Sequence, residues 1–118
     1  MHKPMSDSGL SELSVSQLRA RRRRLARSVG DPQATLRGTL QRQGRRCGRA
    51  GCRCARGELH GPYLYLAVHA DGGGRSIYVP GALAGTVGAL VEATVGREAA
   101  LAEISRINLE LLRRRALG

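Results

Sequence analysis

Apolar residues recur at helical spacing near the start of the chain. With 100° per residue, four of them fall within about 80° of one another. They are Val15, Leu18, Leu25 and Val29. Ser14 followed by Gln17 has the spacing of a capping box, which marks the beginning of a helix. We therefore predict an amphipathic helix over residues 11–29, after a disordered tail over residues 1–10, with Arg22 interrupting the apolar stripe.

An alternating pattern of residue types in the middle of the chain predicts a β-hairpin over residues 62–80. A turn centred between Gly72 and Gly73 places Leu66 opposite Val79. One face of the hairpin then carries aliphatic side chains, which are Leu64, Leu66, Val68, Ile77 and Val79. The other face carries the three tyrosines, Tyr63, Tyr65 and Tyr78. Because an isolated hairpin is only marginally stable, the aliphatic face must pack against another element.

Helical spacing of apolar residues returns over residues 81–116 and predicts a long C-terminal helix. Gly96 falls between two apolar stripes of this helix and is expected to kink or break it. Upstream of the hairpin, the pattern over residues 36–46 allows a short strand. The expected architecture is one α+β domain over residues 11–118, built from a basic N-terminal helix, a Cys/His loop, a β-hairpin and a long C-terminal helix.

Charge divides the chain into two halves. Residues 1–56 hold 14 of the 20 basic residues and three of the nine acidic residues, so the whole net charge of +11 falls in this half. A positive field of this size attracts polyanions such as nucleic acids. The chain contains no Phe and no Trp. Their absence argues against a large ligand pocket, because such pockets are normally lined by aromatic and apolar side chains.

Three thiols and one imidazole lie close together in the sequence. They are Cys47, Cys52, Cys54 and His60. Three cysteines and one histidine are the ligand set of a closed structural zinc site, and we predict such a site in the loop region of residues 36–61. Neighbouring cations lower the cost of holding thiolate charge. The basic residues around the motif are Arg45, Arg46, Arg49, Arg53 and Arg56.

Other interpretations of the three cysteines stay open at this point. The cluster is also consistent with a site for another metal, with small buried apolar residues, or with a redox thiol switch. A nucleophilic cysteine with His60 as its base is disfavoured, because no nearby Asp or Asn in the sequence would orient the imidazole. We therefore expect a structural Zn²⁺ ion and no enzymatic activity.

Several segments around the Cys/His motif form a specific pattern. They are residues 36–40, 46–48, 51–57 and 60–66, followed by residues 77–80 and a C-terminal helix with Asn108 near its end. This pattern, with the core C-G-x3-C-x-C-x5-H-G-P-Y, resembles a family of short bacterial proteins classed as a domain of unknown function. The resemblance covers residues 36–112, and Leu64 departs from it at a position that is often Tyr. It implies the order helix, Cys/His loop, hairpin and long helix, and it implies no activity.

The distribution of arginine indicates nucleic-acid binding. The predicted N-terminal helix carries Arg19, Arg21, Arg22, Arg23, Arg24 and Arg27. These side chains and the loop arginines suit contacts to phosphates, which release counterions and make binding depend on salt. Tyr63 and Tyr65, together with Tyr78, offer a stacking surface for bases. We expect a cytoplasmic zinc-binding protein that binds nucleic acid as an accessory to a DNA-processing enzyme.

Protein interaction is the alternative function. The helices predicted over residues 11–29 and 81–116 carry apolar stripes, so they can pair with each other, with a second copy or with a partner protein. The zinc ion then only staples the fold, and Asn108 sets the register of the helix pair. No apolar run is long enough for a membrane helix, so we expect no membrane association.

Overall fold

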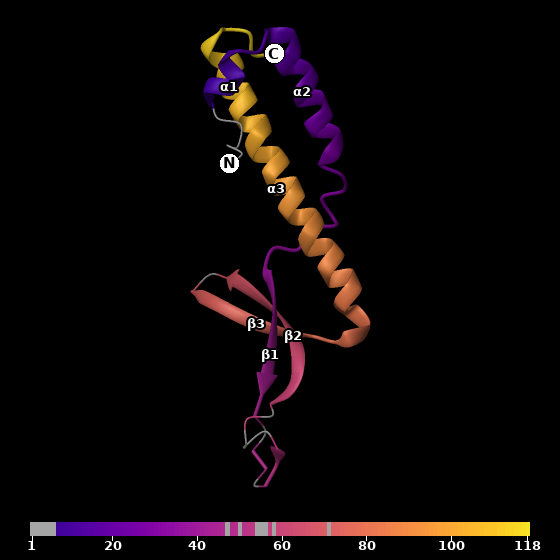
Figure 1. The fold of residues 1–118 in the computed structure, drawn as a ribbon. Helices are drawn as coiled ribbons and strands as arrows, with labels where there is room; N and C mark the ends of the chain where they lie inside the picture. The colour runs from indigo at the N-terminus through magenta and orange to yellow at the C-terminus, as the bar shows by residue number, and fades with distance from the viewer. Residues whose placement is uncertain (1–6, 47, 50, 54–56, 58, 71) are drawn as a thin grey trace. The chain divides into compact units, whose positions relative to one another are not determined.

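The computed structural model describes the chain except for residues 1–6, 47, 50, 54–56, 58 and 71. Its elements are α1 (Asp7–Ser11), α2 (Val15–Ser28), β1 (Thr39–Arg45), β2 (His60–Ala70), β3 (Gly73–Val79), the short 3-10 helix η2 (Gly81–Leu83) and α3 (Ala84–Arg113) (Figure 1). The predicted α+β class is confirmed. The chain divides into two compact units, a helical unit of Met1–Gln33 with Val95–Gly118 and a sheet unit of Ala34–Thr94.

The helix predicted over residues 11–29 is confirmed with narrower bounds as α2, Val15–Ser28, and the predicted capping box closes its first turn. Ser14 Oγ accepts a hydrogen bond from the Gln17 backbone N–H at 3.0 Å, and Gln17 Oε1 accepts one from the Ser14 N–H at 2.8 Å. The core of the helical unit consists of four fully buried side chains, Leu10, Leu18, Ile107 and Leu111. Residues 7–10, expected in the tail, instead belong to α1, which places Leu10 in this core.

Arg22, which interrupts the apolar stripe of α2, has partners in the C-terminal part of the helical unit. Its Nη1 donates a hydrogen bond to Asn108 Oδ1 at 2.7 Å, and its Nη2 donates to the Gly118 carbonyl at 2.9 Å. Asn108 interrupts the apolar stripe of α3 in the same way. The two polar residues therefore satisfy each other within an otherwise apolar contact, and they align α2 with α3 inside one chain.

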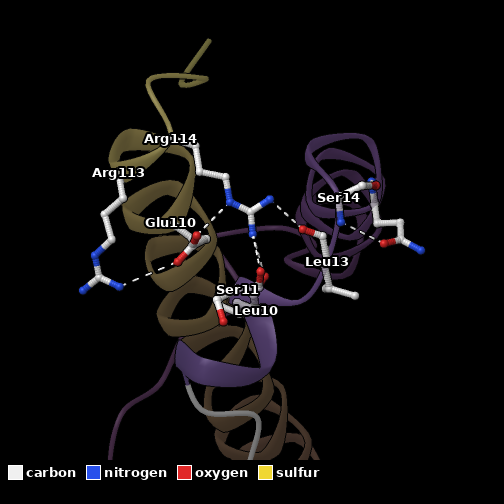
Figure 2. A network of polar contacts seen from close by, with 8 residues as sticks. Leu10, Ser11, Leu13, Ser14, Glu110, Arg113 and Arg114 are labelled. Carbon is white, nitrogen blue, oxygen red and sulfur yellow. Dashed lines mark hydrogen bonds and ion pairs between the residues drawn. The ribbon is translucent and has the colours of Figure 1, made fainter.

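Arg114 joins the end of α3 to the chain around α1 (Figure 2). Its Nε donates to Glu110 Oε2 at 2.8 Å, and its Nη1 donates to the Leu13 carbonyl at 2.6 Å. Its Nη2 donates to the carbonyls of Leu10 and Ser11 at 3.1 and 3.0 Å. Glu110 is buried, so this one guanidinium compensates a buried carboxylate and also satisfies backbone carbonyls at the end of a short helix.

The sheet unit contains a three-stranded antiparallel sheet in the order β1-β2-β3. The short strand that the sequence allowed over residues 36–46 is confirmed as β1, and the hairpin is confirmed as β2 and β3. The predicted register of this hairpin is wrong by two residues, because Leu66 pairs with Ile77 and not with Val79. A shift of two residues leaves each side chain on the face that the alternation predicted.

The connection between β2 and β3 explains the difference in register. Ala70 pairs with Gly73, so two residues, Asp71 and Gly72, lie between the strands. Asp-Gly is a favoured sequence for two-residue hairpin loops, whose central positions need positive φ angles. Gly72 has a φ of 86°. The loop therefore begins one residue earlier than a turn centred on the glycines would place it.

The segment that leads into β1 is tied to the N-terminal part of α3. The Leu36 backbone N–H donates to Thr94 Oγ1 at 2.8 Å, and the buried Thr94 hydroxyl donates to the Leu90 carbonyl at 2.7 Å. A Cβ added to Gly88 of α3 would lie in ordinary contact with the Leu40 side chain, at 3.9 Å from its Cδ1. Leu40, which lies on the aliphatic face of the sheet, therefore approaches the helix within the sheet unit.

The long C-terminal helix is confirmed, with narrower bounds than the predicted 81–116, since Gly81–Leu83 form η2 and α3 ends at Arg113. It continues through Gly96 without a break. A Cβ at Gly96 would meet no atom within 4 Å. Across the described part of the chain, no helix combines the length and the apolar character that crossing a membrane requires.

Candidate metal centre and arginine-rich surface

A bulge at the start of β2 sets the position of His60. Gln43 pairs with Tyr63, whereas Arg45 pairs with His60, so two steps along β1 correspond to three steps along β2. Gly61 lies within this bulge with a φ of 103°, and a Cβ there would be 2.6 Å from the Tyr63 backbone nitrogen. Bulges turn side chains away from the regular alternation of a strand. Only glycine fits this backbone, and it gives His60 its place at the end of the strand pair.

Cys52 and His60 are brought together at this end of the sheet. Cys52 Sγ lies 3.2 Å from His60 Nε2. A tetrahedral zinc ion with bonds of about 2.3 Å to sulfur and 2.0 Å to nitrogen holds two such atoms about 3.5 Å apart. The observed separation is therefore within a few tenths of an ångström of the distance that joint coordination requires. The two side chains line a hollow of about 320 Å³ together with Arg49 and Tyr63.

The other two predicted zinc ligands, Cys47 and Cys54, lie outside the described residues. The described residues contain no group of three or more His, Cys, Asp or Glu side chains that would hold a metal ion. Two of the four predicted ligands are thus placed in coordinating proximity. A half-buried thiol beside an imidazole is a donor pair that zinc prefers, so these two residues fit the predicted ion.

The loop arginines lie on the same segment as the thiols. The side chains of Arg46, Arg49 and Arg53 are exposed. The side chain of Arg45 and all of Arg56 lie outside the described part of the chain. The three exposed guanidinium groups combine positive charge with access to solvent, which a phosphate contact needs.

The arginines of α2 fall into two groups. Arg19, Arg21 and Arg22 are partly buried and engaged within the helical unit, where Arg19 donates to the Ala116 carbonyl at 2.9 Å and Arg21 forms an ion pair with Glu103 at 2.6 Å. The exposed group consists of Arg23, Arg24 and Arg27. Only the exposed group presents its charge outward. The sequence analysis predicted phosphate contacts for all six arginines, because the sequence does not indicate which of them form contacts within the helical unit.

The three tyrosines form an edge-to-face cluster on β2 and β3. The Tyr78 ring centroid lies 6.2 Å from that of Tyr63 and 5.8 Å from that of Tyr65. Tyr65 is only 7% exposed, whereas Tyr63 is 38% and Tyr78 51% exposed. Tyr65 is therefore the buried member of the cluster, where it packs against Tyr78, and it offers no open ring face to a ligand. Tyr63 and Tyr78 are the rings that a ligand can reach.

Arg42 is a neighbour of this cluster that the sequence did not single out as a site residue. Its side chain is exposed, and it lines a second hollow, of about 260 Å³, with Pro62, Tyr63 and Tyr78. Arg42 pairs with Leu64 in the next strand, so the alternation of β1 places it on the aliphatic face, opposite the tyrosines. It reaches this hollow at the end of the sheet, where Leu64 and Val79 also line it.

Comparison with known families gives one match. A family model described as "Domain of unknown function (DUF6788)" matches residues 15–87. The matched region begins at α2 and ends inside α3, so it starts and ends earlier than the resemblance over residues 36–112. Neither the curated proteins nor the solved structures contain a match to the chain.

Proposed function

Because the chain belongs to the family described as a domain of unknown function, we propose its function from its own residues. The protein is a small zinc-binding protein that binds nucleic acid through an arginine-rich surface, as an accessory to a DNA-processing enzyme. The observation that carries the metal part is the separation of 3.2 Å between Cys52 Sγ and His60 Nε2. The nucleic-acid part rests on the exposed arginines of α2 and of the segment between β1 and β2 that contains the cysteines of the Cys/His motif, which we call the Cys/His segment.

In this proposal the zinc ion has a structural role and joins neighbouring segments of the sheet unit. Cys52 comes from the segment between β1 and β2, and His60 is the first residue of β2. Cys47 and Cys54 supply the remaining two ligands of a closed site. The sheet unit has few buried apolar side chains among its described residues, the largest being Tyr65, Leu66 and Val79. A bound metal adds folding free energy that such a small core lacks.

Elemental analysis of the purified protein tests the metal site. We expect one zinc per chain, and we expect Cys52→Ser and His60→Gln each to lose most of it, because each removes a ligand. His69→Gln is the matched control, since His69 is an exposed histidine near the other end of the same strand. Zinc that stays at one per chain in Cys52→Ser and His60→Gln would show that these residues do not bind the metal.

Nucleic-acid binding in this proposal depends on charge. Arg23, Arg24 and Arg27 are exposed on α2, and Arg46, Arg49 and Arg53 are exposed on the Cys/His segment. Each phosphate that such a side chain neutralises releases counterions. The affinity therefore falls steeply as salt is added. Contacts of this kind bind the backbone and read little sequence.

Fluorescence anisotropy of labelled DNA and RNA across a salt series tests this proposal. We expect Arg24→Gln with Arg27→Gln to lower the slope of log affinity against log salt by about 2. The control pair, Arg113→Gln with Arg115→Gln, removes two exposed charges from the end of the same unit and should change the slope less. A flat salt response of the unmodified protein would contradict nucleic-acid binding.

One observation favours the alternative, a self-associating helical module. Leu101, Leu109 and Leu112 of α3 are exposed by 43% or more. At helical spacing they lie on one side of α3, where a second helix would cover them. Light scattering over a concentration series separates the two functions. A molar mass that rises with concentration, without any binding of nucleic acid, would favour self-association.

A further inference from the structure

Two hollows on the sheet unit share one tyrosine. The first is the hollow of about 320 Å³ at the candidate metal centre, with Arg49 and Tyr63 in its wall. The second is the hollow of about 260 Å³ that contains Arg42, Tyr63 and Tyr78. Because Tyr63 belongs to both, the two hollows form one surface that runs from the metal centre along the start of β2 to the end of β3. We call it the tyrosine surface.

The exposed rings of the tyrosine surface are held in place from within the sheet. Tyr78 packs edge-to-face against Tyr63 with an interplanar angle of 75° and against the buried Tyr65 with an angle of 63°. Such contacts fix the orientation of an aromatic ring. Tyr78 nevertheless stays half exposed. An oriented and accessible aromatic ring is the feature on which single-stranded nucleic acids stack their bases.

The charges of the tyrosine surface have one sign. Arg42 and Arg49 lie in the walls of the two hollows, and no Asp or Glu is among the described residues that line them. A complementary ligand therefore carries a flat ring together with negative charge. A nucleotide unit has both, and a nucleic-acid strand repeats them at every step.

The size of the surface limits what it can hold. The hollow of about 320 Å³ is at the lower end of the volumes that small-ligand sites occupy, and the hollow of about 260 Å³ is below it. Neither hollow therefore suits more than one nucleotide unit. In a duplex the bases are stacked on their neighbours and cannot reach such a site unless they are extruded. In a single strand the base faces are available. The geometry therefore favours an unpaired strand over a duplex.

We propose that the tyrosine surface binds an unpaired nucleotide of a single strand, with the base on Tyr63 and Tyr78 and a flanking phosphate near Arg49. This inference rests on the proposed nucleic-acid binding and deepens it by naming the class of nucleic acid. The arginines of α2 and of the Cys/His segment attract nucleic acid of either kind, single-stranded or duplex. The tyrosine surface distinguishes single strands from duplexes.

Anisotropy measurements on the full, zinc-loaded chain test the inference. The probes are a short fluorescent DNA strand of mixed sequence and the same strand annealed to its complement. We expect Tyr63→Leu and Tyr78→Leu each to weaken single-strand binding about tenfold or more, and to leave duplex binding unchanged. Tyr78→Phe keeps the ring and should keep the affinity. Ile77→Leu is the matched control, because Ile77 is the neighbouring β3 residue with the same exposure of 51% but lies on the opposite face.

The possible outcomes separate this inference from the proposed function. Single-strand affinity that is unchanged in both leucine variants, but lowered by the α2 arginine substitutions, would overturn the inference and leave nucleic-acid binding intact. Absence of binding to any strand at low salt would overturn both. A third outcome is that millimolar AMP binds, that this binding depends on Tyr78, and that the single strand does not bind. This outcome would assign the surface to a free nucleotide and overturn the proposal that it binds a single strand. Circular dichroism verifies that each variant is folded, and Tyr63→Leu gives the readout if Tyr78→Leu does not fold.

Discussion

Replacing Arg114 with methionine is expected to lower the free energy of unfolding of the helical unit by about 3 kcal/mol or more. Methionine keeps much of the apolar stem of the side chain, so the loss comes from the guanidinium. Glu110, with 8% of its surface exposed, would then lose its closest cation, and the Leu13 and Ser11 carbonyls would lose a charged donor. Urea unfolding followed by helical circular dichroism measures this change.

Arg113→Met is the control for this substitution, because Arg113 is the adjacent residue and reaches the same carboxylate. Its Nη1 lies 3.7 Å from Glu110 Oε1, and its side chain is 55% exposed (Figure 2). A long ion pair whose cation is exposed contributes at most about 1 kcal/mol. Equal losses in the two variants would mean that the carbonyl contacts around α1 do not contribute to stability.

Replacing Gly61 with alanine is expected to destabilise the sheet unit by about 2–4 kcal/mol and to weaken zinc binding. The added Cβ would lie 2.6 Å from the Tyr63 backbone nitrogen, and the φ of 103° is strained for any residue with a side chain. Relief of the clash requires the backbone of the bulge to move. His60 is the adjacent residue, so its imidazole moves away from Cys52.

Two measurements follow this substitution, thermal unfolding and zinc affinity from competition with a chromogenic chelator. Gly72→Ala is the matched control, because Gly72 also has a positive φ, of 86°, but an added Cβ there would meet no atom within 4 Å. It should lose stability through the backbone angle alone and keep its zinc affinity. Unchanged zinc affinity in Gly61→Ala would show that the bulge does not position the metal ligand.

The helices and strands were predictable because each depends on local pattern. The capping-box spacing of Ser14 and Gln17 indicated the start of α2. The alternation around Leu66 predicted the correct face for each side chain of the hairpin. The register was wrong by two residues because the position of a turn depends on which pair of residues adopts positive φ angles. Asp-Gly is a favoured sequence for such a loop and Gly72 has the positive φ angle, so the loop lies one residue before the position predicted from the glycine run.

The contacts between distant segments could not be predicted in the same way. The helical periodicity places Arg22 in the apolar stripe of α2, but nothing local identifies Asn108 as its partner, or the Leu13 carbonyl as a partner of Arg114. These partners are brought together only when α3 packs within the helical unit. At the candidate site, too, some features could be predicted from local pattern and others could not. The Cys/His spacing predicted the donor pair, whereas the burial of Tyr65 depends on the packing of the folded sheet.

The helical unit is assembled from two separate stretches of chain, with the whole sheet unit between them. Leu10 and Leu18 complete their core only with Ile107 and Leu111. During synthesis, when domains generally fold as they emerge, the N-terminal helices must wait with their apolar residues uncovered until the ribosome has released the far end of α3. The sheet unit has no such dependence, so it is the first part of the nascent protein that can fold.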